Sequence, residues 1–184
     1  MLFRSANSTA PVKGLLCRFR RSRGGSAAVE FALVAPMFFA LLFAIIETAI
    51  MFFAGQVLET ITQNSARTIL TGQSQGAGYT SLAQFQTAVV CPQIPALFTC
   101  ANMAVDVESW ASFSGSMAIN NLIDTSCNFT NLQYSPGGPG DFVLVKLAYK
   151  WPLFVTGFGF NITTPGCSSK RLLVAAAAFK NEPY

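Results

Sequence analysis

A glycine, a glutamate and an aromatic residue stand close together where a long apolar run begins: the glycine leaves the backbone accessible to a protease, and the carboxylate beside the apolar run requires a partner. Gly25 precedes the small residue Ser26, and Glu30 and Phe31 follow shortly after. A glycine lets an extended backbone approach a protease closely, and small residues after it leave that approach unobstructed. The pattern therefore suits a cleavage site between Gly25 and Ser26.

Glu30 and Glu47 are the only ionisable residues of the apolar run. An ionised and unpaired carboxylate there costs several kcal/mol, so each glutamate calls for a partner. The alternative for Glu30 is a membrane-interface residue whose side chain reaches toward water. Glu47 lies about 25 Å further along a helix and on a different face, so we expect it to contact a different neighbour or another element of the same assembly.

The remaining reactive side chains do not form a catalytic pattern. The chain has no histidine, which excludes Ser-His and Cys-His nucleophiles and mixed Cys/His zinc sites. Asp106, Glu108, Asp124 and Asp141 lack metal-loop spacing. Asp106 and Glu108 would share one face of a strand, which a solvated face explains equally well. We therefore expect no enzyme, no cofactor and no metal.

Four of the five cysteines, Cys91, Cys100, Cys127 and Cys167, lie in the distal part of the chain. An even number in a domain outside the cytoplasm fits two disulfides, although four cysteines permit three pairings. We prefer Cys91 with Cys100 and Cys127 with Cys167. The alternative is that some of them are buried thiols.

Charge and hydropathy divide the chain into three parts. Of 184 residues 52% are hydrophobic and 11% charged, and the net charge of +4 arises from six basic residues before Ser26, where there is no acid. Positive charge beside an apolar run sets membrane orientation, so residues 1–25 are predicted to be a basic cytoplasmic leader and nucleic-acid binding is not expected. Residues 27–54 match the ~20 residues that cross a hydrocarbon layer. Apolar residues at helical spacing continue to Leu70, so a spanning helix with an amphipathic stalk is predicted over 26–71, ending near Gly72.

Residues 72–184 are predicted to form a small extracytoplasmic domain. Residues 81–90 read as a short helix that ends at Cys91-Pro92. Three segments read as strands, 103–113, 141–151 and 171–179, although the alanines of the last one also favour a helix. In the second strand Val143, Val145, Leu147 and Tyr149 share one face. The predicted fold class is α+β, a long N-terminal helix packed against a small antiparallel sheet.

The segment from Gly25 to Phe31, after a basic cluster and before the apolar run, resembles the cleavage region of prepilins and pseudopilins. Residues 20–70 resemble more narrowly the TadE/TadG-like family of tight-adherence (Flp) pilus assembly, and the closing FKNEPY is similar to the ends of many members. The resemblance implies a pilin-like fold and removal of the leader after Gly25 by a prepilin peptidase. It also implies that Glu30 pairs with the new ammonium group of Ser26 in a neighbouring subunit, that Phe31 belongs to the same motif, and that Glu47 is functional.

The sequence leaves three functional hypotheses. The first is a minor pseudopilin of a tight-adherence pilus or related secretion machine, held in the bacterial inner membrane among other pilin-like subunits. The second is an uncleaved single-pass envelope protein that binds a ligand or partner through its outer domain. The third, a secreted enzyme, is disfavoured because the apolar run is longer than the 7–15 residues of a signal core and contains two glutamates.

Overall fold

A computed structural model describes residues 25–112, 119–154 and 161–184. The predicted leader, up to residue 24, lies outside the described residues. The chain divides into two compact units, Met1–Phe43 and Ala44–Tyr184, and we call the second the sheet unit.

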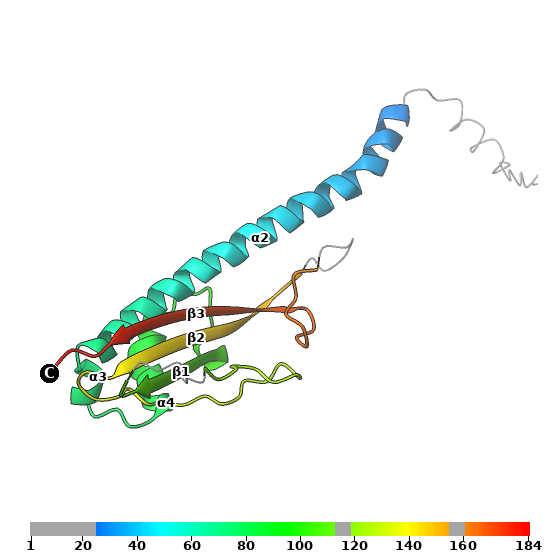
Figure 1. Ribbon diagram of the computed structural model, residues 1–184. Helices are drawn as coiled ribbons and strands as arrows, with labels where there is room; N and C mark the ends of the chain where they lie inside the picture. Colours follow the sequence, from blue (N-terminus) through cyan, green and yellow to red (C-terminus); the bar gives the residue numbers. More distant parts are fainter. Residues whose placement is uncertain (1–24, 113–118, 155–160) are drawn as a thin grey trace, which may run out of the picture. The chain divides into compact units, whose positions relative to one another are not determined.

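One long helix, α2, runs from Ser26 to Leu70 (Figure 1). Among the described residues, one helix is long and apolar enough to cross a membrane. This segment is Ala27–Leu70 of α2. Its most apolar 18 residues have a mean hydropathy of 2.4, and none of them is buried. The helix ends where the sequence predicts, because Gly72 follows with φ 74°, a conformation that L side chains rarely adopt.

Short helical segments connect α2 to the sheet. Two are short α-helices, α3 (Gln73–Gly76) and α4 (Leu82–Phe85), and α4 continues as a π-helical turn, η2 (Gln86–Val90). Two 3₁₀ turns follow, η3 (Cys91–Gln93) and η4 (Cys100–Asn102). Ser81 and Gln84 form a capping box that satisfies backbone donors at the start of α4. The helix predicted over 81–90 is thus present as α4 and η2, whereas α3 lies in a stretch that the sequence presents only as polar and Gly-rich.

Three strands form an antiparallel sheet in the order β1-β2-β3. They are β1 (Met103–Trp110), β2 (Phe142–Pro152) and β3 (Lys170–Lys180). The central strand, β2, pairs with both neighbours, so that Val145 lies opposite Val107 on one side and Ala177 on the other. All three predicted strands and the α+β fold class are confirmed, and the helical alternative for 171–179 is wrong.

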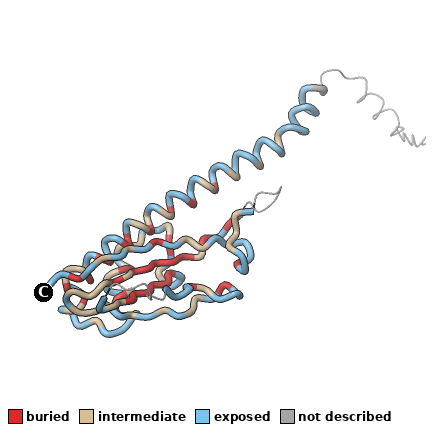
Figure 2. The backbone as a smooth tube through the Cα atoms, viewed as in Figure 1, coloured by how far each residue is buried: buried red, intermediate tan, exposed pale blue. Residues whose placement is uncertain are grey.

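The core of the sheet unit lies between the sheet and the last turns of α2. Leu58, Ile61 and Ile69 from the helix belong to one buried cluster with the apolar face of the sheet. Figure 2 shows buried residues concentrated on the central strands and on one side of this helical segment. The predicted inward face of β2 is confirmed, since its four residues are all buried: Val143, Val145, Leu147 and Tyr149.

The opposite face of the sheet is covered by the loop between β1 and β2. Leu122, with Phe129 and Leu132 beside it, packs against Ala104 and Ala148. The same loop also protects the outer edge of β1. Its residues 133–135 run parallel to β1, where the Val107 amide donates to the Gln133 carbonyl at 2.9 Å and the Ser135 amide donates to the Val107 carbonyl at 2.8 Å.

Candidate functional site

The proposed processing motif lies at the first turn of α2. Gly25 directly precedes the helix, and a Cβ atom added to it would meet no described atom within 4 Å. Glu30 is exposed, and Phe31 is 68% exposed. The motif is therefore accessible on the surface of the chain, which recognition by another protein requires.

Glu47, by contrast, is buried within the sheet unit at 8% exposure. Its carboxylate oxygen Oε1 accepts a short hydrogen bond from the backbone amide of Phe154, just after the end of β2. This bond ties the β2 end of the hairpin to α2. A partner for the Glu47 carboxylate thus lies within the same chain, and no local sequence pattern points to the Phe154 amide in this role.

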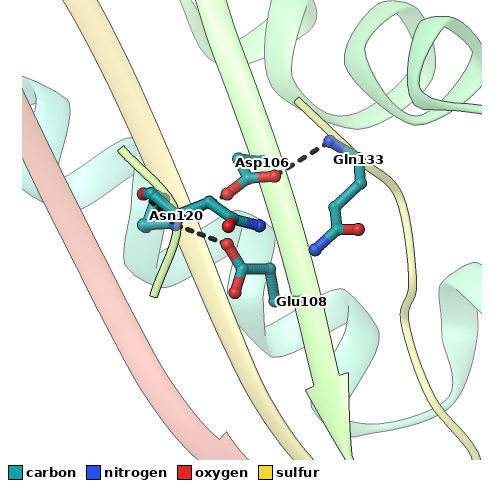
Figure 3. Close-up of polar contacts among 5 residues, drawn as sticks. Asp106, Glu108, Asn120 and Gln133 are labelled. Atoms are coloured by element: carbon teal, nitrogen blue, oxygen red, sulfur yellow. Dashed lines mark hydrogen bonds and ion pairs between the residues drawn. The ribbon is translucent and has the colours of Figure 1, made fainter. Parts of the chain in front are cut away.

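A cluster of three charged residues is buried beneath the loop that covers the sheet. Asp106 and Glu108 project from the same face of β1, and Lys146 projects from β2 directly opposite Asp106 (Figure 3). The Lys146 Nζ atom lies 2.8 Å from Asp106 Oδ2 and 2.6 Å from Glu108 Oε1. Exposed fractions are 0% for Asp106, 1% for Glu108 and 5% for Lys146. The interpretation of the two acids as a solvated strand face is therefore wrong.

The buried cluster also holds the covering loop in place at two points. Lys146 donates to the Asn120 carbonyl at 3.2 Å, and Asp106 accepts from the Gln133 amide at 2.9 Å. Sequence reasoning missed Lys146, whose only signal was a charged residue in the middle of an apolar strand. The cluster contains two acids and one base, and Glu108 Oε2 has no hydrogen-bond partner among the described residues. We assign it a structural role, because it lies under the loop rather than in an open cavity.

The titration of Glu108 follows from this environment. Burial raises the pKa of its carboxyl above 4.5, and the nearby Asp106 adds to this, although Lys146 opposes it. For Lys146, burial alone lowers the pKa, but the hydrogen bonds and charges of the two acids outweigh it and raise the pKa above 10.5. At neutral pH the lysine is therefore charged, while the folded state favours the protonated form of Glu108 more than the unfolded chain does.

Glu108→Gln is expected to change the pH dependence of stability. Because the folded pKa of Glu108 is raised, its stabilising contribution is fully present below about pH 4.5 and is lost as pH rises through the folded value. Glutamine does not titrate, so the Tm of the variant relative to the wild type should increase between about pH 4 and pH 7. Thermal unfolding in detergent micelles, followed by near-UV circular dichroism, measures this difference.

Asp124→Asn is the control for this pH series. Asp124 is fully exposed, and hydrogen bonds from the Asn128 and Ser126 amides lower its pKa below 3.8. Its contribution is therefore present above that value and is lost only as pH falls, so the Tm difference should stay flat over the same range. A flat profile for Glu108→Gln as well would contradict the assignment of a raised pKa to Glu108.

Two disulfides stabilise the loops around the sheet. Cys91 is bonded to Cys100, with Cα atoms 5.5 Å apart, and Cys127 to Cys167, with Cα atoms 5.1 Å apart. These are the pairs preferred in the sequence analysis. The second bond joins the covering loop to the segment between β2 and β3 and closes 40 residues, so it removes more unfolded-chain entropy than the first, which closes nine.

A comparison with known families decides how the helical segment is classified. Residues 25–67 match the family described as TadE-like protein. This segment is TadE-like. The match begins at Gly25 and includes Glu30, Phe31 and Glu47, so the resemblance found in the sequence is confirmed over the region that carries the motif. No curated protein and no solved structure matches the chain.

The TadE-like family is a structural family of Tad pilus assembly, and the similarity to it concerns residues 25–67. The family match and the long apolar helix are compatible with a single-pass membrane protein. The match ends within α2, at Arg67, so it does not include the sheet or the two disulfides.

Proposed function

We propose that the chain is a minor pseudopilin of a tight-adherence, Flp-type pilus or of a related secretion machine. The TadE-like match over residues 25–67 carries this proposal, because it begins at the glycine of the cleavage motif. The protein would be held in the bacterial inner membrane by α2, with its N-terminus in the cytoplasm and the 72–184 domain on the outer side. Its partners would be a prepilin peptidase and other pilin-like subunits.

Cleavage between Gly25 and Ser26 is the first step of the proposed function. It would remove the six basic residues that precede Ser26 and leave a new ammonium group at the start of α2. The exposed Glu30 carboxylate of a neighbouring subunit would pair with that group and set the axial register of assembly. Each charge would provide the partner that the other needs at the edge of an apolar layer, where their mutual attraction offsets the cost of removing them from water. Phe31, also exposed, would pack against the same neighbour.

Gly25→Leu is expected to block processing. The chain itself has room for a side chain at residue 25, so a loss of cleavage would arise in the protease complex rather than from misfolding. We expect the rate of cleavage to fall by about 100-fold, the usual cost of misplacing a reacting bond by an ångström. The measurement is the intact mass and N-terminal sequence of the membrane-bound protein in cells that express a prepilin peptidase.

Gly55→Leu is the matched control, since Gly55 lies within α2 and a Cβ there also meets nothing within 4 Å. Its processing should equal that of the wild type. A wild-type N-terminus at Ser26 supports the pseudopilin, whereas an intact N-terminus in the presence of the peptidase supports the second candidate, an uncleaved envelope protein that binds through its outer domain. Unchanged cleavage of Gly25→Leu would also exclude the proposed site.

A further inference from the structure

Phe154 is an exposed aromatic residue whose backbone is held by hydrogen bonds to other parts of the chain. Its side chain is 86% exposed, the largest fraction among the large apolar side chains of the described residues. The preceding residue, Leu153, is buried in the core, and its amide donates to the Ser169 carbonyl at 2.9 Å. The Phe154 amide itself donates to Glu47. The backbone at Leu153 and Phe154 is thus held by hydrogen bonds while the ring is exposed, although exposure of an aromatic side chain to water is unfavourable.

The hydrogen bond to Glu47 also fixes the position of Phe154 along α2. Exposed apolar side chains of this helix continue past Glu47 and include Ile50 and Phe53, the latter 62% exposed. Phe53 lies about 9 Å beyond Glu47 along the helix, at 1.5 Å per residue. A bilayer surface that covers these exposed apolar residues therefore reaches the level of Phe154, which is bonded to Glu47.

Basic residues flank Phe154 on the facing strand. Lys170 and Arg171 are exposed at the start of β3 and pair with Pro152 and Trp151 of β2. The sequence between Asp141 and Glu182 contains no acidic residue. An aromatic ring beside two cations suits the membrane interface, where the ring meets the upper acyl chains and the cations meet lipid phosphates.

We propose that Phe154, Lys170 and Arg171, where β2 ends and β3 begins, form a membrane-contact surface that rests on a phospholipid bilayer; this inference rests on the proposed function, in which α2 crosses that bilayer. The sheet unit is then held at two points, by α2 and by Phe154 in the interface. This restricts its rotation about the helix axis. The contact also places the buried Glu47 carboxylate at the interface, where the hairpin covers it and its hydrogen bond to the Phe154 amide is shielded from water.

Quenching of tryptophan fluorescence by brominated lipids tests the proposal. The full-length protein is placed in nanodiscs of phosphatidylcholine and phosphatidylglycerol, and the fluorescence of the parent protein is subtracted from that of three variants. Phe154→Trp probes the proposed contact. Val174→Trp, at a residue of β3 that is 49% exposed, is the matched control, and Phe38→Trp, at an exposed residue of α2, reports whether the helix is in the bilayer.

An interfacial aromatic residue lies within about 5–10 Å of the acyl boundary, so bromine near the top of the acyl chains should lower the added Phe154→Trp fluorescence about twofold. Val174→Trp should be unchanged, and Phe38→Trp should be strongly quenched by bromine deeper in the chains. If Phe154→Trp is no more quenched than Val174→Trp while Phe38→Trp is quenched, the contact is overturned and the membrane anchor stands. If Phe38→Trp is not quenched, both the proposed insertion of α2 in the bilayer and the proposed contact of Phe154 with it are wrong.

Discussion

Lys146→Met is expected to lower the free energy of unfolding of the sheet unit by about 3–5 kcal/mol, because it leaves two buried carboxylates without their cation. Asp106 and Glu108 are 0% and 1% exposed, and Lys146 Nζ is within 2.8 Å of both. The substitution also removes the hydrogen bond that holds the Asn120 carbonyl. Denaturant unfolding in detergent micelles, followed by tryptophan fluorescence, gives the difference.

Lys150→Met is the matched control on the same strand. Lys150 is half-buried and lies over the Phe129 ring at 4.1 Å, a contact that contributes about 0.5–1 kcal/mol. Its loss of stability should therefore be several times smaller. Combining Lys146→Met with Asp106→Asn and Glu108→Gln should restore most of the lost stability, since no buried charge then remains. Equal losses for the two lysine variants would show that the cluster does not carry the charges assigned to it.

Phe85→Ala is expected to cost about 3–5 kcal/mol, the usual range for removing a fully buried aromatic side chain. Phe85 is 0% exposed at the end of α4 and packs against Tyr134 with ring centroids 5.2 Å apart. Tyr134 belongs to the segment that protects the edge of β1. The substitution therefore opens a cavity that loosens both the connecting helix and the edge of the sheet, and the same denaturant titration measures it.

Phe154→Ala makes the same chemical change at an exposed residue. Phe154 is 86% exposed, so its truncation leaves no cavity in the protein and should cost several times less stability than Phe85→Ala. If the two phenylalanine variants lost equal stability, the assignment of Phe85 as a core residue that packs against Tyr134 would be wrong.

The first two strands were predictable because their pattern is local, whereas the alanine-rich third strand was predicted with a helical alternative left open. Alternation in β2 marks Val145 and Leu147 as inward residues, and any sheet that buries one face preserves this. In β3 the alanines favour a helix by intrinsic propensity, and pairing along the full length of β2 overrides it. Propensity is worth tenths of a kcal/mol per residue, so tertiary pairing decides such segments.

The candidate sites also differ in how far apart their residues lie in the sequence, and this decides which of them could be predicted. The motif from Gly25 to Phe31 is contiguous, so the sequence displays it whole and the TadE-like match begins there. Lys146 follows its partners Asp106 and Glu108 by about forty residues, and the burial of all three depends on both the strand register and the covering loop. The hydrogen bond of the Glu47 carboxylate comes from the Phe154 amide, more than a hundred residues later in the chain. Such contacts are set by the fold, and no local pattern contains them.

The order of elements along the chain has a consequence for biogenesis. The last turns of α2 carry an apolar stripe, including Leu58 and Ile69, that is buried only when the sheet packs on it. Completion of the sheet requires β3, about 110 residues after Leu70, because the central strand pairs on both sides. In the proposed topology the residues after α2 are exported in chain order, so this stripe would emerge long before the strands that cover it. A chaperone on the outer side or the lipid surface would then shield it from aggregation until β3 arrives.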